Sequence, residues 1–119
     1  MTNQEIANRL HQLVKAGDYF TAYDELFDKD VVAKEPQLEA MGLGEVKGID
    51  SVKDKVAKLG EGVAELISRE MSTPIVTDKH IAFTNIVKAK LKDGGDFNLS
   101  EICLYEIQEG KIVSEEFIY

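Results

Sequence analysis

The sequence predicts an α+β domain in which three helices cover one face of a curved antiparallel sheet and leave a pocket between the two layers. Two observations predict this fold class. Apolar residues recur at helical spacing up to about residue 60, whereas from Val63 onward they follow the spacing of strands separated by short turns. At 119 residues the chain is the size of one domain, 1–119, and can bury a core without disulfides or metal.

The first helix is predicted to begin at a capping box, Thr2-x-x-Glu5, in which each side chain satisfies a backbone N–H group. Gly17 ends this helix. The apolar residues of the helix share one face: Ile6, Leu10, Leu13 and Val14. Asp18 is expected to cap a second helix with its own apolar face: Phe20, Tyr23, Leu26 and Phe27. The two helices then form a compact corner.

A short β-branched segment, 30–35, ends at Pro36, because proline biases the residue before it toward an extended backbone. Residues 36–50 contain three glycines and are predicted to form a loop that acts as a rim or lid. A third helix is expected to begin at Ser51-x-x-Asp54 and to end at Gly60 and Gly62. Its apolar face is Val52, Val56 and Leu59.

Four long strands are predicted over roughly 64–76, 79–92, 96–108 and 111–119, joined by short turns into an antiparallel meander. The last turn allows two registers. A two-residue turn pairs Tyr105 with Ser114, whereas a three-residue loop, 108–110, with Gly110 in the left-handed region pairs Tyr105 with Val113. We favour the second. It places these residues on one face: Leu99, Glu101, Cys103, Tyr105, Ile107, Val113, Glu115, Phe117 and Tyr119.

The opposite face of these two strands would carry four large aliphatic residues: Ile102, Leu104, Ile112 and Ile118. A sheet with one solvated side should alternate apolar and polar residues, so a cover is expected on this side too. The helices can cover only one side. We therefore predict a homodimer through the outer sheet face, the alternative being a monomer with a few exposed aliphatics.

Composition narrows the function classes. The net charge of −8, from 22 acidic and 14 basic residues, repels phosphate backbones, so no nucleic acid partner is expected. No apolar stretch is long enough to span a bilayer, and the polar N-terminus does not resemble a signal peptide. With the lone Cys103 unable to form an internal disulfide, these features predict a cytoplasmic protein. His11 and His80 lack neighbouring ligands, so neither metal nor cofactor is expected.

Three segments carry a resemblance to a known family: LVKAGDYFTAYDELFDKDVVAKEP (13–36), KGIDSVKDKV (47–56) and EGKIVSEEFIY (109–119). Their order resembles the nuclear transport factor 2-like superfamily, and especially its SnoaL-like, polyketide cyclase-like and ketosteroid isomerase-like members. The resemblance implies three N-terminal helices packed on a strongly curved, mostly antiparallel sheet that forms a cone with an internal ligand pocket.

The resemblance also implies roles for individual residues. Glu35, in Lys34-Glu35-Pro36, stands where ketosteroid isomerases have a catalytic Asp before Pro, so a carboxylate fills the position of the base. The oxyanion-hole Tyr and protonated Asp of those enzymes correspond to Leu10, which cannot donate, and to Cys103, a weak donor.

Glu35 is the predicted general base, since burial at the mouth of an apolar pocket raises the pKa of a carboxyl group. The alternative is an exposed Glu at the end of a strand. Tyr105 and Tyr23 could donate to a carbonyl or enolate oxygen, or they could simply pack and find local partners.

The remaining candidates are expected to bind ligand. Glu101 and Glu115 would face the pocket from neighbouring strands, or they would lie at its wet rim. Asn85 is either a hydrogen-bonding anchor or a satisfied core amide. Cys103, as a small hydrophobe, and Phe117 complete the predicted lining.

The sequence therefore predicts a protein that binds a small apolar molecule bearing a carbonyl group, with isomerase or cyclase chemistry that begins with proton abstraction by Glu35. The alternative is a non-catalytic module for ligand binding or dimerisation.

Overall fold

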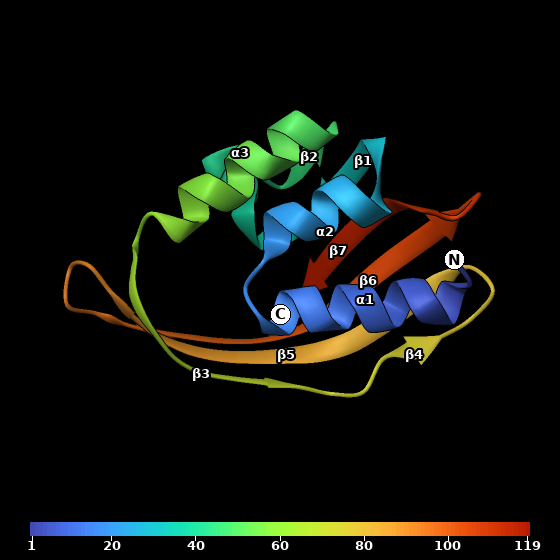
Figure 1. Cartoon of the computed structure of the whole chain (residues 1–119). Helices are drawn as coiled ribbons and strands as arrows, with labels where there is room; N and C mark the ends of the chain where they lie inside the picture. The colour runs from blue at the N-terminus through green and yellow to red at the C-terminus, as the bar shows by residue number, and fades with distance from the viewer.

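The computed structural model describes all residues, 1–119, and contains a seven-stranded sheet with helices on one side (Figure 1). The helices are α1 (Asn3–Lys15), α2 (Tyr19–Leu26), the 3-10 helix η1 (Pro36–Met41) and α3 (Ile49–Gly60). The strands are β1 (Phe27–Lys34), β2 (Glu45–Lys47), β3 (Val63–Met71), β4 (Ile75–Val76), β5 (His80–Leu91), β6 (Asp96–Gln108) and β7 (Lys111–Ile118).

The strand order is β2-β1-β7-β6-β5-β3, with the short β4 paired to β5. Only β1 and β7 pair in parallel; every other pairing is antiparallel. The sheet curves beneath α1, α2 and α3, which lie on one side of it (Figure 1). The predicted α+β fold class, with its curved and mostly antiparallel sheet, is confirmed.

The predicted capping box at the start of α1 is confirmed. The backbone N–H of Glu5 donates to Oγ1 of Thr2 over 3.1 Å, and the backbone N–H of Thr2 donates to Oε1 of Glu5 over 2.9 Å. The apolar face predicted for this helix is buried, together with one alanine: Ile6, Ala7, Leu10, Leu13 and Val14.

Helix α2 ends one residue earlier than its apolar pattern predicts. Phe27 has an extended backbone (φ −97°, ψ 147°) and begins β1 instead, where it pairs with β7. Phe20, predicted on the apolar face, is 47% exposed. Asp18 occupies the N-cap position, but its side chain accepts from the hydroxyl of Thr21 (2.7 Å) and makes no bond to the helix backbone.

The segment 36–50, predicted to be a loop, contains η1 and β2, and α3 begins two residues before the predicted Ser51. Gly48, at φ 91°, adopts a conformation that strongly favours glycine, and this turn directs the chain into α3. The predicted strand 64–76 is interrupted between β3 and β4, where Pro74 lacks the N–H group that a ladder needs.

The β6–β7 hairpin has the shorter of the two predicted turns. Gln108 pairs with Lys111, so Glu109 and Gly110 form a two-residue turn. Their φ angles are 50° and 76°, and a type I′ turn requires positive φ at both positions. The three-residue loop favoured by the sequence is therefore wrong.

A β-bulge between Glu106 and Ile107 then shifts the register by one residue, so Tyr105 lies opposite Glu115 and opposite neither predicted partner. The shift returns β7 to the side-chain alternation that the sequence predicted. Of the expected inward residues of both strands beyond the bulge, four are buried: Glu101, Cys103, Tyr105 and Glu115. Leu99 and Phe117 are half-buried, and Tyr119 is 43% exposed. Close to the turn the prediction is wrong, since Ile112 was expected outside and is fully buried.

The hydrophobic core lies between the helices and the inner face of the sheet. Its members include Leu10 of α1, Leu26 of α2, Val52 of α3, Phe83 of β5 and Ile112 of β7. No helix combines the length and the apolar composition that a membrane span requires.

Candidate functional site

A cavity of about 530 Å³ lies between the helical layer and the sheet, and 20 of its 28 lining residues are hydrophobic. Helices α1, α2 and α3 contribute to its wall, as do β1, β3, β5, β6 and β7. All eight residues predicted to form the site line this cavity: Tyr23, Glu35, Asn85, Glu101, Cys103, Tyr105, Glu115 and Phe117.

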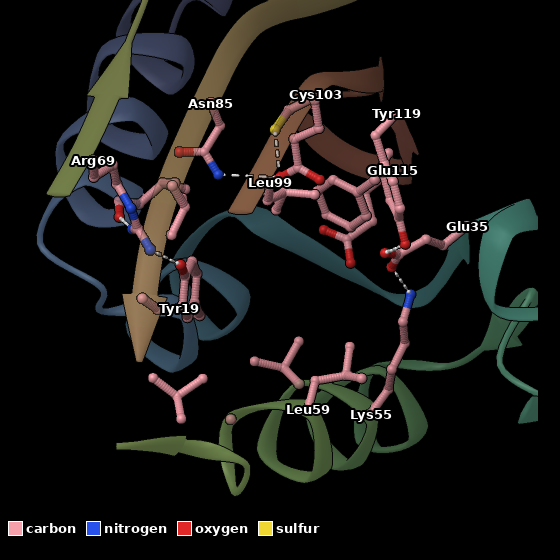
Figure 2. A pocket seen from close by; sticks show the side chains of 18 of the residues that line it. Tyr19, Glu35, Lys55, Leu59, Arg69, Asn85, Leu99, Cys103, Glu115 and Tyr119 are labelled. Carbon is pink, nitrogen blue, oxygen red and sulfur yellow. Dashed lines mark hydrogen bonds and ion pairs between the residues drawn. The ribbon is translucent and has the colours of Figure 1, made fainter. Parts of the chain in front are cut away.

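Glu35, between β1 and η1, is bound on both carboxylate oxygens (Figure 2). Lys55 of α3 places its Nζ 2.8 Å from Oε1, and the hydroxyl of Tyr119 donates to Oε2 over 2.7 Å. Glu35 and Lys55 are 8% and 3% exposed, so this ion pair is sheltered from water. Glu35 therefore faces the cavity as one half of a neutral pair.

Glu115, in the middle of β7, is the carboxylate most enclosed by the fold. It is 2% exposed, and Oε1 accepts a hydrogen bond from the hydroxyl of Tyr23 over 3.0 Å. Burial raises the pKa of Glu115 to about 7, against smaller opposing effects from Tyr23 and from the positive charge of Lys55. The carboxyl group can therefore both accept and release a proton near neutral pH.

Glu101 of β6 belongs to a second polar group, which it forms with Asn85 and Cys103. Its Oε1 accepts from Nδ2 of Asn85 over 3.0 Å and from Sγ of Cys103 over 3.5 Å. Burial raises the pKa of Glu101, while these two bonds act in the opposite direction. Burial also raises the pKa of Cys103, so its thiol stays neutral.

Tyr105 lies in an aromatic cluster with Phe27, Phe83 and Phe117, at centroid distances of 6.1, 5.7 and 6.5 Å. It is 3% exposed, and burial raises its pKa well above the usual value. The phenol therefore stays protonated and can act only as a neutral donor or a packing group.

Arg69 of β3 lies on the other side of the cavity from Glu35, beside Tyr19 (Figure 2). Its Nη2 donates to the Tyr19 hydroxyl over 2.5 Å, its Nη1 donates to the carbonyl of Val14, and the guanidinium stacks 5.5 Å from the Tyr19 ring centroid. These contacts join β3 to the end of α1 and the start of α2.

Sequence reasoning missed Lys55, Arg69 and Tyr119 as site residues. A signal existed for Lys55, because it stands one position before Val56 and three after Val52, on the apolar face of α3. A lysine there must reach a partner across the core. Tyr119 was placed on the inward face but given no role. Arg69 carried no comparable signal.

Leu10 and Cys103, which the resemblance matched to the donor positions of the isomerases, both line the cavity and are buried. No cluster of three or more His, Cys, Asp or Glu residues could hold a metal ion. The cavity thus offers an apolar wall, three carboxyl groups, of which Glu115 has a pKa near neutral pH, and two cations.

The model of the SnoaL-like domain family matches residues 1–119. Among solved structures, a Mesorhizobium loti protein named for its likeness to SnoaL-like polyketide cyclases is 25% identical, with 100% of both chains covered and a TM-score of 0.86. An NTF2-like protein of unknown function from Burkholderia pseudomallei is 17% identical, with 98% of this chain and 89% of that chain covered and a TM-score of 0.81. A search of curated proteins finds no match.

Proposed function

The chain belongs to the SnoaL-like domain family, and from this premise we propose that it binds a small apolar molecule with a carbonyl group and removes a proton from the carbon beside it. The burial of Glu115 in the cavity is the observation that carries this proposal. A fully buried carboxyl group with a pKa of about 7 in an apolar cavity is suited to general-base catalysis near neutral pH.

The proposal places the base at Glu115, whereas the sequence favoured Glu35. Glu35 already holds Lys55 and Tyr119 on its two oxygens, and proton abstraction would require breaking one of these contacts. Glu115 has a single hydrogen bond, from Tyr23 to Oε1, so its second oxygen is available to a ligand. Glu35 then serves to fix the ammonium group of Lys55.

Lys55 is suited to stabilise the oxygen on which charge develops. An ammonium group has three N–H donors, and its ion pair with Glu35 leaves others for a ligand oxygen. In the proposed step Glu115 takes the proton, the electron pair of the broken C–H bond forms the C=C bond of an enolate, and the negative charge moves to the oxygen beside Lys55. Return of the proton to the same or another carbon completes an exchange or an isomerisation.

Hydrogen–deuterium exchange of 2-tetralone in D2O tests this chemistry, because this apolar ketone has acidic protons beside its carbonyl. Proton NMR of the wild-type protein should show exchange faster than in buffer alone. Glu115→Gln should lower the protein-dependent rate by about 10²- to 10⁴-fold, the usual contribution of a general base. Glu106→Gln, on the outer face of β6, is the matched control.

Glu35→Gln separates the two candidate bases. If its exchange rate falls as far as predicted for Glu115→Gln while Glu115→Gln keeps the wild-type rate, Glu35 is the base and our assignment is wrong. Exchange at the buffer rate with wild-type protein that binds the ketone would refute catalysis of this kind.

A non-catalytic binding module is the second candidate function. It is favoured by Leu10 and Cys103 at the positions where the isomerases have hydrogen-bond donors, and by the ion pair that already occupies Glu35. Binding of the ketone without any exchange is the result that this alternative predicts.

A further inference from the structure

The two cations of the cavity differ in how their charge is compensated. Lys55 forms an ion pair with Glu35 at 2.8 Å. Arg69 forms none: both groups that accept from it, the carbonyl of Val14 and the hydroxyl of Tyr19, are neutral. The C-terminal end of α1 supplies about half a negative charge near Val14. The carboxyl group of Glu101 also interacts with Arg69 through space, since Arg69 helps to lower the pKa of Glu101, but it forms no ion pair with the guanidinium.

Two polar atoms on this side of the cavity also lack partners. Nε of Arg69 and Oδ1 of Asn85 are both buried and make no hydrogen bond. The two residues are diagonal neighbours on the sheet, since Arg69 pairs with Val87 and Asn85 pairs with Met71. Unpaired buried polar atoms of this kind are costly, and both residues line the cavity.

We infer that Arg69 and Asn85 form an anion-binding subsite of the cavity, which takes an acidic oxygen of the ligand at the guanidinium and a neighbouring N–H or O–H donor at Oδ1 of Asn85. This inference rests on the proposed function. It narrows the ligand class to apolar molecules with an acidic group, such as a carboxylate, a sulfonate or an acidic enol, separated from the carbonyl.

The arrangement of the cavity fits a ligand with polar groups at two ends. Arg69 and Tyr19 lie on one side, and the ion pair of Glu35 with Lys55 lies on the other, with Glu115 between them (Figure 2). Most of the lining between the two ends is hydrophobic. An acidic group at Arg69 would hold the apolar body of the ligand across the cavity, within reach of Glu115.

Two fluorescent probes that differ by one group test the subsite. 1-Anilinonaphthalene-8-sulfonate has a sulfonate beside an N–H group, whereas N-phenyl-1-naphthylamine has the same rings and N–H without the sulfonate. The wild-type protein should bind both. Arg69→Gln should lower the affinity for the sulfonate probe by about tenfold or more, which is the usual contribution of a charge-assisted hydrogen bond. It should change the affinity for the neutral probe by less than about twofold.

The other arginine of the chain provides the matched control. Arg9 pairs with Glu25 on the surface (2.8 Å), so Arg9→Gln should leave both affinities unchanged. Leu99→Trp, which fills part of the cavity, should weaken the binding of both probes and so show that they bind in the cavity. If Arg69→Gln does not fold, Asn85→Asp provides a second test, since it keeps the contacts of Arg69 with Val14 and Tyr19. It replaces the amide that donates to Glu101 by a second carboxyl group, so binding is measured at alkaline pH, where the two groups do not share a proton and the added negative charge opposes the sulfonate.

Each outcome separates the two proposals. If both probes bind in the cavity and neither Arg69→Gln nor Asn85→Asp weakens the sulfonate selectively, Arg69 and Asn85 satisfy each other and the subsite does not exist. The proposed function would survive that result. If neither probe binds wild-type protein, the cavity is not a ligand site and both proposals fail.

Discussion

The ammonium group of Lys55 on α3 lies 2.8 Å from Oε1 of Glu35 at the end of β1, and the two side chains are 2% and 11% exposed. A buried pair of this kind gains little over an apolar pair of similar shape, but removal of one partner leaves a buried charge without its opposite charge. The pair therefore makes α3 and β1 depend on each other.

Single substitutions of this pair should be far more harmful than the double substitution. We expect Glu35→Leu and Lys55→Met each to lower the free energy of unfolding by about 3–5 kcal/mol, and the double variant to regain most of that loss. Urea denaturation of the four proteins measures the coupling. Lys53 pairs with Asp24 on the exposed side of α3, so Lys53→Met should cost less than about 1 kcal/mol. Additive losses in the double variant would contradict the prediction.

Glu115 makes stability depend on pH with a sign opposite to that of an ordinary paired carboxylate. Its pKa is about 7 in the folded protein, against 4.5 for an unperturbed glutamate. Between these pH values the folded protein binds one proton more than the unfolded chain. Titration of this group should therefore lower the free energy of unfolding by about 1.4 kcal/mol for each unit by which the pH rises in this range. Below pH 4.5 the group contributes nothing, and above pH 7 its cost is constant.

Comparison with Glu115→Gln isolates this contribution. The wild-type protein should lose about 3 kcal/mol relative to the variant between pH 4.5 and 7, measured by urea denaturation across that range. Carboxylates that do not interact with Glu115 are common to both proteins and cancel in the difference, which therefore contains the titration of Glu115 and its coupling to Glu35 and Glu101. A constant difference across the range would show that Glu115 is ionised throughout.

The period of two along a strand made much of the site predictable. Glu101, Cys103, Tyr105 and Glu115 were assigned to one face by alternation alone, and they are buried. The register was wrong, yet an error of two residues in the pairing keeps every side chain on its own face. The two-residue turn moves the pairing by one residue from the favoured register, and the bulge after Glu106 moves it by one more. The predicted lining was therefore right although the cross-strand partners were not.

The partners of these residues could not be predicted, because they depend on contacts between elements distant in sequence. The hydroxyl of Tyr119 reaches Glu35 across 84 residues, and Tyr23 reaches Glu115 across 92. Such contacts depend on the curvature of the sheet and on the position at which α3 packs against it. Periodicity gives the face of a residue, but it does not give the residue that will meet it.

The turn of the last hairpin can be improved by one substitution. Glu109 has φ 50°, in the left-handed region that costs most residues 1–2 kcal/mol and that asparagine tolerates better. We expect Glu109→Asn to raise the free energy of unfolding by about 0.5–1 kcal/mol, because Asn-Gly is the preferred type I′ turn. Gly110→Ala, at φ 76°, should lower it by about 1 kcal/mol or more. Thermal denaturation followed by circular dichroism measures both, and a loss of stability in Glu109→Asn would contradict the prediction.

The outer face of the sheet is where we expect a second copy of the chain to bind. Ile102 and Ile118 pair directly across β6 and β7 and are 46% and 42% exposed, and Ile86, diagonal to Ile102 on β5, is 40% exposed. In a two-fold interface each substitution occurs twice, so Ile102→Glu would bring like charges together in an apolar contact. Size-exclusion chromatography with light scattering should show a wild-type dimer and an Ile102→Glu monomer with unchanged circular dichroism. Ile75→Glu, on the short strand β4 where Ile75 is 69% exposed, should remain dimeric. A wild-type protein that stays monomeric at high concentration would mean that these aliphatic side chains are simply exposed to water.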